Sequence, residues 1–399
     1  MKTRISGMIL AAGLGVGGLS AQADDMAKAI EKIEKCRGGS CVILSIRGKG
    51  ITQVPQDVLD LKGLPGLALT GTAIEDFSPL ATIEGLGHLN LGRTGFADLT
   101  VVSGMHGLQE LELEQSNVSD LGPIAGLTGL KSLRLGDTVV SDLAPLAEMK
   151  ALQKLDLRKS AVTDIAPLAA LTALKDLDIG DTKITDFAPL AGLRSLEKLD
   201  LRRGAISDLT PLAQLTGLVD LSLSNTKLSD LAPLAGLAGL EKLQLDKTGI
   251  SDLTPLAGLS RLRWLTLGDT QVSDLAPLAG LPQLSILDLR GTPVSDVTPL
   301  GQVAVLSSLT LEESAVTDIS ALAGLEFLTD LSLKDTGVSD ISAVQNLVAL
   351  KSLTLTGTQV RDLSPLMALP DLSTLRLGKD HGLPADQIAA LEARGVKIR

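Results

Sequence analysis

The chain has 399 residues, of which 44% are hydrophobic although only 1% are aromatic. A compact domain of this size normally fills its interior with large rings, so a core of Leu, Ile, Val and Ala favours many small, identical layers. The formal net charge of -11 has the wrong sign for a protein that binds the phosphates of nucleic acids.

Residues 1–23 have the pattern of a secretory signal peptide. Lys2 and Arg4 supply the positive charge, and residues 5–20 form an apolar run. Ala21–Ala23 then gives a small-x-small cleavage pattern. A permanent membrane anchor is the alternative, but the run is shorter than the roughly 20 residues that a span needs. We therefore expect a mature chain without a membrane span, either periplasmic or secreted.

Residues 24–41 are expected to form an N-terminal cap. Met26–Cys36 has an amphipathic helical pattern, with Ile30 and Ile33 on one face. Cys36 and Cys41 frame the segment Arg-Gly-Gly-Ser. Two cysteines this close pair in an oxidising compartment, so the spacing predicts a disulfide, with two free thiols as the alternative.

Residues 42–378 repeat one 22-residue pattern. In the copy that begins at Leu152, Leu155 and Leu157 lie two positions apart. Alternate residues of a strand face opposite sides, so these leucines point inward, whereas Lys154 and Arg158 point into solvent. Such units stack on one another, and the pattern predicts a solenoid of about 15 to 16 coils with a continuous leucine core.

An Asp marks the same position in fourteen successive copies: Asp76, Asp98, Asp120, Asp142, Asp164, Asp186, Asp208, Asp230, Asp252, Asp274, Asp296, Asp318, Asp340 and Asp362. Each precedes Leu-x-Pro-Leu or a close variant. Its carboxylate can cap a short helical turn by accepting backbone N–H groups, and the Pro suits the first turn. A calcium ladder is the alternative, but calcium needs about six to eight oxygens and each coil offers one carboxylate.

This unit resembles the internalin-type leucine-rich repeat over residues 42–378. One position differs throughout, because the polar residue that is usually Asn is Thr or Ser here, as at Thr138, Ser160 and Thr270, with Gly204 as the exception. The resemblance implies an α/β solenoid: a horseshoe with one long parallel sheet on the concave face and short 3-10 or helical turns on the convex side. It implies a binding surface rather than a particular receptor.

Residues 379–399 are expected to cap the other end of the solenoid. Pro384–Ala393 has a helical pattern, and Gly395 is suited to ending that helix. Val396–Ile398 can then add an edge strand to the sheet.

Residues that could carry chemistry form no recognisable motif. His88, His106 and His381 are scattered along the sequence, no group has metal-ligand spacing, and no Ser can be assigned a neighbouring base. We therefore expect no enzyme activity, no bound metal and no cofactor.

The outward face of the sheet remains as the candidate binding surface. Charges in its first column alternate from Lys154 to Lys242 and are expected to pair along the sheet. The next column contains Asp156, Asp178 and Asp200, which form either a network with nearby Lys and Arg residues or a cation site. The surrounding basic residues favour the network.

Trp264 interrupts this polar face. It is the one Trp of the chain, and Ile286 follows it one coil on. Asp288 and Arg290 extend the neighbouring strand, and Asp269 lies just beyond the Trp264 strand. The sequence predicts that these five residues contact a partner, because binding surfaces combine an apolar centre with charged edges. The alternative is that Trp264 merely stacks on Lys242 of the preceding coil.

The sequence therefore predicts a non-catalytic, monomeric scaffold outside the cytoplasm. It is expected to bind or adhere to a protein partner through the concave face of the solenoid. An envelope polysaccharide is the second ligand class, and a structural envelope protein without a discrete ligand is the alternative of a different kind.

Overall fold

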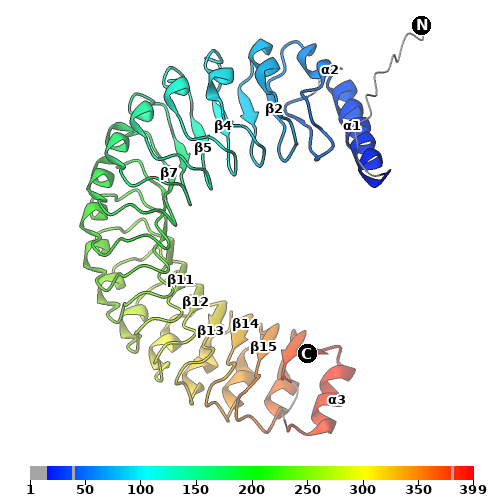
Figure 1. Cartoon of the computed structure of the whole chain (residues 1–399). Helices are drawn as coiled ribbons and strands as arrows, with labels where there is room; N and C mark the ends of the chain where they lie inside the picture. The colour runs from blue at the N-terminus through cyan, green and yellow to red at the C-terminus, as the bar shows by residue number, and fades with distance from the viewer. Residues whose placement is uncertain (1–15, 38–40, 379–381) are drawn as a thin grey trace. The chain divides into compact units, whose positions relative to one another are not determined.

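The computed structural model describes residues 16–37, 41–378 and 382–399. The chain divides into two compact units, Met1–Val140 and Ser141–Arg399, and each is described by itself. Both units alternate short strands with single turns of 3-10 helix (Figure 1). The expected signal segment, residues 1–23, lies mostly outside the described residues.

The first unit contains five parallel strands, each paired with the next along the chain. Its elements are α1 (Val16–Arg37), β1 (Leu44–Ser45), α2 (Gln56–Leu59), β2 (Gly66–Ala68), η1 (Ser78–Thr82), β3 (His88–Asn90), η2 (Leu99–Val102), β4 (Glu110–Glu112), η3 (Gly122–Ile124) and β5 (Ser132–Arg134). The sequence prediction missed α2, which follows Pro55. Proline's fixed φ, here −62°, suits the start of a helix.

Helix α1 begins at Val16, earlier than the predicted start at Met26. Leu19, Ala21, Gln22 and Ala23 in the added turns favour a helix, whereas Gly17 and Gly18 do not. Ala29 and Ile33 are buried, and Lys32 Nζ donates to the Ser45 carbonyl oxygen of β1 over 2.8 Å. Through these contacts α1 packs on the first coil and covers it.

A disulfide joins Cys36, near the end of α1, to Cys41, with 4.8 Å between their Cα atoms. The predicted bond is therefore present at the junction of the cap helix and the first strand. Arg37 adds an ion pair to Asp57 of α2, with 2.6 Å between Nη2 and Oδ1. The cap is thus tied to the first coil by covalent and ionic contacts.

The second unit contains twelve described strands, again parallel and paired in chain order. The strands are β6 (Lys154–Asp156), β7 (Asp176–Asp178), β8 (Lys198–Asp200), β9 (Asp220–Ser222), β10 (Lys242–Gln244), β11 (Trp264–Thr266), β12 (Ile286–Asp288), β13 (Ser308–Thr310), β14 (Asp330–Ser332), β15 (Ser352–Thr354), β16 (Thr374–Arg376) and β17 (Lys397–Ile398).

Short 3-10 turns connect these strands. They are η4 (Ala144–Leu146), η5 (Ala166–Ala170), η6 (Ala188–Gly192), η7 (Thr210–Leu212), η8 (Ala232–Leu234), η9 (Thr254–Leu256), η10 (Ala276–Leu278), η11 (Thr298–Gln302), η12 (Ser320–Gly324), η13 (Ser342–Asn346) and η14 (Ser364–Ala368). Within this unit the strands line the inner side of its curve and the 3-10 turns the outer side (Figure 1). The predicted class, a leucine-rich-repeat solenoid, is confirmed.

One coil shows why the sequence forms these layers. Leu155 and Leu157 are 2% and 0% exposed, whereas Lys154 and Arg158 are exposed. The strand therefore alternates between core and solvent as its sequence predicts. On the return leg Leu168 is fully buried, so each layer of the core is built from Leu, Ile and Val with little other material.

The Asp column caps the 3-10 turns in all fourteen copies. At Asp230, Oδ1 accepts the backbone N–H of Ala232, the first residue of η8, over 2.8 Å. Each of the thirteen remaining Asp residues of the column accepts the same bond from the backbone N–H of the residue two positions on. The capping prediction is confirmed, and each carboxylate serves its own turn.

The threonines of the hydroxyl column close the turns that follow their strands. Thr270 Oγ1 donates to the Leu267 carbonyl oxygen over 2.7 Å, and the corresponding Thr bonds recur in other coils. The preceding residue, Asp269, has a left-handed φ of 57°. Thr therefore replaces the usual Asn in satisfying the turn carbonyl. Among the described residues, the buried hydroxyls of Ser116 and Ser160 have no hydrogen-bond partner.

The C-terminal segment closes the last coil. α3 (Ala385–Ala393) occupies the segment where the sequence predicts a helix, and Gly395 follows it with φ 88°. β17 then pairs with β16. The Arg394 guanidinium donates to the carbonyl oxygen of Met367 over 2.9 Å, which ties the cap to η14.

Candidate binding surface

Strands β11 and β12 carry the centre of the predicted site. Trp264 and Ile286 are register partners on these strands. Leu265, the middle residue of β11, is fully buried. Alternate residues of a strand face opposite sides, so Trp264 faces away from the core. Trp264 is 40% exposed and Ile286 is half-buried. An aromatic and an aliphatic side chain therefore lie side by side on the open face of this part of the sheet.

Lys242 lies against Trp264 from the preceding strand. The two are register partners, and Lys242 Nζ is 5.1 Å from the centroid of the Trp264 ring. The same Nζ is 3.4 Å from Asp220 Oδ2. The stacking alternative raised by the sequence is thus observed, but it leaves two-fifths of Trp264 exposed. The cation–π contact orients the indole without covering it.

Asp288 and Arg290 form an ordered charged edge beside this pair. Arg290 Nη2 is 2.5 Å from Asp288 Oδ2, and the Arg290 backbone N–H donates to Asp288 Oδ1 over 3.0 Å. The Arg290 side chain passes over Gly268, where an added Cβ would lie 3.1 Å from Arg290 Cγ. Burial raises the pKa of Asp288, although the backbone N–H and the guanidinium of Arg290 oppose that rise.

Asp269 lies beyond the end of β11 and is exposed. Its backbone N–H donates to the Arg290 carbonyl oxygen over 2.8 Å. Its Oδ1 would be 2.4 Å from a Cβ added at Gly291, so the glycine leaves room for this carboxylate. Trp264, Ile286, Asp288, Arg290 and Asp269 therefore all lie on two adjacent coils.

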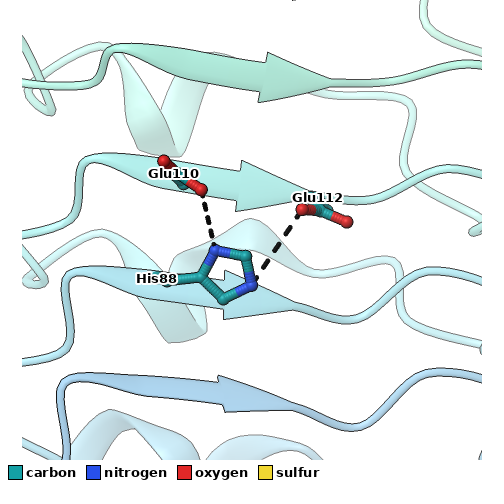
Figure 2. Close-up of side chains that lie close together, drawn as sticks. All are labelled: His88, Glu110 and Glu112. Atoms are coloured by element: carbon teal, nitrogen blue, oxygen red, sulfur yellow. Dashed lines mark hydrogen bonds and ion pairs between the residues drawn. The ribbon is translucent and has the colours of Figure 1, made fainter. Parts of the chain in front are cut away.

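A second cluster, in the first unit, was missed by the sequence analysis. The imidazole of His88 on β3 lies between the carboxylates of Glu110 and Glu112 on β4 (Figure 2). His88 Nδ1 is 3.0 Å from Glu110 Oε2, and His88 Nε2 is 4.0 Å from Glu112 Oε1. Among the described residues, this is the one group of three or more His, Cys, Asp or Glu residues whose ligand atoms all lie within 4.8 Å of one another.

The spacing explains why no motif revealed this cluster. His88 and Glu110 are 22 positions apart, which is one repeat, and they become neighbours only through the parallel register of β3 and β4. The detectable signal was a His and a Glu in one outward column of successive repeats. This position therefore holds a candidate ligand group that the sequence analysis did not select.

Comparison with known proteins agrees with the leucine-rich-repeat fold. The family model described as leucine-rich repeats in two copies matches residues 150–192. The crystal structure of an internalin, InlF, from Listeria monocytogenes is 30% identical, with a TM-score of 0.66, and the match covers 82% of this chain and 94% of that one. The chain belongs to the internalin-type leucine-rich repeat proteins.

Two more distant structures share the fold of this internalin-type chain. A leucine-rich-repeat protein of Leptospira interrogans has a TM-score of 0.81 at 22% identity, covering 94% of this chain and 98% of its own. The leucine-rich-repeat ectodomain of a plant receptor kinase from Arabidopsis thaliana, in complex with Casparian strip integrity factor 2, has a TM-score of 0.68 at 18% identity, covering 89% and 49%. No curated protein sequence matches the chain.

The charged columns of the internalin-type sheet are less regular than predicted. In the alternating column of the second unit, the described residues form one ion pair, between Lys242 and Asp220. In the aspartate column, Arg202 Nη2 is 2.5 Å from Asp200 Oδ2 and Arg158 Nη2 is 3.4 Å from Asp156 Oδ2. These contacts fit the predicted network of arginines and aspartates.

Phe327 is a further exposed apolar residue that the sequence analysis did not select. It lies between η12 and β14 and is 63% exposed, and Val305 at the same place in the preceding coil is 39% exposed. Most other coils have Ala, Gly, Ser or a polar residue there. A large ring in that column was the available signal. None of the helices within the described residues is long and apolar enough to cross a membrane.

Proposed function

We propose that this internalin-type protein is a non-catalytic scaffold that recognises a protein partner through the outward face of β11 and β12. The observation that carries the proposal is the exposed Trp264, set beside Ile286 on an otherwise polar face. Leucine-rich-repeat solenoids typically serve as binding scaffolds because stacked strands create an extended surface. Trp is also among the residues that most often dominate the affinity of an interface.

The neighbours of Trp264 prepare it for binding. Lys242 holds one part of the ring at a centroid distance of 5.1 Å, so less side-chain entropy is lost when a partner covers the rest. The Asp288–Arg290 pair is already formed in the free protein and offers a fixed charge pattern at the edge. Asp269 adds a further exposed carboxylate. An apolar centre with charged edges matches the usual anatomy of a protein interface.

A polysaccharide ligand is the second candidate, and one observation weakens it. Sugar sites favour stacked aromatic rings, whereas Trp264 is the one Trp of the chain and Tyr is absent from it. A structural protein without a discrete ligand would need no exposed indole on this face. Recognition of a protein partner therefore explains more of the observed features than either alternative does.

We also propose that the protein acts outside the cytoplasm, in the periplasm or in the medium. Two features support this location. The sequence of residues 1–23 has the signal-peptide pattern, and the disulfide between Cys36 and Cys41 belongs to an oxidising compartment.

The test begins with a pull-down from envelope extract, using the mature chain as bait, followed by affinity measurements with the purified partner. Trp264→Ala should weaken binding by about 2 kcal/mol, or about thirtyfold, and leave the thermal midpoint nearly unchanged. Lys154→Ala, in the charged column, and Phe327→Ser are the matched surface controls and should bind like the wild type. Retention of a saccharide in place of a protein, or a loss caused by a control but not by Trp264→Ala, would refute the placement.

A further inference from the structure

We propose that His88, Glu110 and Glu112 form a binding site for a divalent transition-metal ion of the zinc class. This site is separate from the proposed protein-binding surface, since all three residues belong to β3 and β4 of the first unit. One imidazole and two carboxylates are a ligand set that suits Zn²⁺, which accepts nitrogen and oxygen ligands in small coordination numbers. Calcium, by contrast, prefers oxygen ligands alone and needs more of them.

The hydrogen bond at Nδ1 determines which ring nitrogen is available to a metal. A carboxylate only accepts hydrogen bonds, so the 3.0 Å contact to Glu110 Oε2 requires a proton on His88 Nδ1. In the neutral ring Nε2 then carries the lone pair. This nitrogen faces Glu112 Oε1 at 4.0 Å, which is too long for a hydrogen bond.

The 4.0 Å separation between Nε2 and Oε1 fits an ion between the two atoms. Zn–N and Zn–O bonds are about 2.0 to 2.2 Å each, so an ion lying slightly off the line would reach both. A tetrahedral angle needs the two ligand atoms at roughly 3.4 Å, so Glu112 Oε1 would move about 0.6 Å closer to Nε2 when the ion binds. Glu110 either joins as the third ligand or stays on Nδ1, the carboxylate–histidine arrangement that commonly orients a metal-bound imidazole.

Glu112 is itself held in place by a chain of hydrogen bonds. Its other oxygen, Oε2, accepts from Asn90 Nδ2. Asn90 Oδ1 in turn accepts from Thr70 Oγ1 over 2.9 Å and from the Gly92 backbone N–H over 3.0 Å. Such outer contacts are typical of metal ligands because they fix the direction of the coordinating oxygen.

Burial and charge also favour a cation at this place. The side chains of His88 and Glu112 are only 16% and 21% exposed, whereas Glu110 is 56% exposed. Arg134 is the register partner of Glu112, but its guanidinium approaches Glu114 instead, at 3.6 Å. Among the described residues, the ion pairs of Glu110 and Glu112 are with His88 alone. Two carboxylates thus lie next to one imidazole. Because the Glu110 side is more exposed, water could reach an ion there and complete its coordination.

Calorimetric titration tests this site. The full chain is purified without an affinity tag, freed of metal by chelation, and titrated with Zn²⁺ and separately with Ca²⁺. We expect one equivalent of Zn²⁺ and no Ca²⁺ to bind. His88→Gln and Glu112→Gln should each lower the Zn²⁺ affinity at least tenfold, and Asn90→Ala should lower it by about tenfold or more through Glu112.

His106→Ala is the matched control, because His106 is an exposed histidine of the same unit and its loss should leave Zn²⁺ binding unchanged. Circular dichroism melts of each variant report whether the fold is kept. As a second readout, the ring resonances of His88 should shift on Zn²⁺ addition in the wild type. The proposal is overturned if the wild type binds no Zn²⁺, or if a folded His88→Gln variant binds it as tightly as the wild type.

Discussion

Asp178 and Asp200 are register partners on β7 and β8, but they are held differently. Arg202 Nη2 lies 2.5 Å from Asp200 Oδ2, whereas Asp178 accepts the backbone N–H of Gly180 over 3.0 Å. Burial raises the pKa of Asp178, and the neighbouring charge of Asp200 adds to that rise. The ionised carboxylate of Asp178 therefore opposes folding at neutral pH.

Replacing Asp178 by Asn should stabilise the protein at pH 7. The amide oxygen can still accept from Gly180, while the cost of burying a charge opposite Asp200 disappears. A raised pKa means that the ionised form opposes folding above that pKa, so the gain should shrink as the pH falls and Asp178 itself becomes neutral. Thermal melts at pH 7 and in acid measure the difference.

The control for that change is Asp200→Asn, which removes the partner of Arg202 and should lower the thermal midpoint at pH 7. A lower midpoint for Asp178→Asn at pH 7 would contradict the electrostatic explanation.

Acid should weaken the caps in which the Asp is followed two positions later by Ser or Thr. In six of these caps the side-chain hydroxyl and then the backbone N–H lower the pKa of the carboxyl: Asp76, Asp98, Asp208, Asp252, Asp296 and Asp362. A lowered pKa stabilises the fold above the ordinary Asp value of 3.8, and this contribution is lost as the pH falls below it.

A triple variant, Thr210→Ala, Thr254→Ala and Thr298→Ala, keeps the backbone bonds but removes three of these hydroxyls. Its midpoint should therefore fall less between pH 7 and acid than that of the wild type. An equal or larger fall would show that the hydroxyls do not set the pH dependence.

The core and the caps should differ in energetic weight. Leu221 is fully buried on β9, and Leu221→Ala should cost about 2–5 kcal/mol of unfolding free energy because it leaves a cavity. Asp230→Ala removes the bond to the Ala232 N–H and should cost about 1 kcal/mol. Asp230→Asn retains an acceptor oxygen and serves as the control. Equal costs for the Leu and Asp variants in denaturant melts would mean that the Asp does more than cap.

The disulfide should be detectable by mass spectrometry of the unreduced, exported protein as a loss of two hydrogens. Replacing Cys36 and Cys41 by Ser should destabilise the N-terminal cap by an amount near the lower end of the usual range of about 2–4 kcal/mol, because the closed loop is short. Two free thiols at Cys36 and Cys41 in the exported protein would contradict the disulfide.

Local patterns in the sequence were sufficient to predict most of this fold. The strand at Leu155 and the cap at Asp230 depend on residues within a few positions of each other, so alternation and turn chemistry identify them. The His88 cluster depends on contact between two coils, and the exposure of Phe327 depends on the path of a loop. Neither can be derived from local spacing, although an unusual residue in a repeated column marks both.

The turn-closing bonds also bear on how such a chain can change its length. Each capping Asp bonds a residue two positions away, as Asp230 does with Ala232, and each Thr bonds a carbonyl three positions back, as Thr270 does with Leu267. These bonds therefore close turns within one coil and do not link neighbouring coils. Recombination that adds or removes one 22-residue unit of the gene breaks none of these bonds in the other coils, and the leucine layers still meet. Related chains are accordingly expected to differ in length by multiples of this unit.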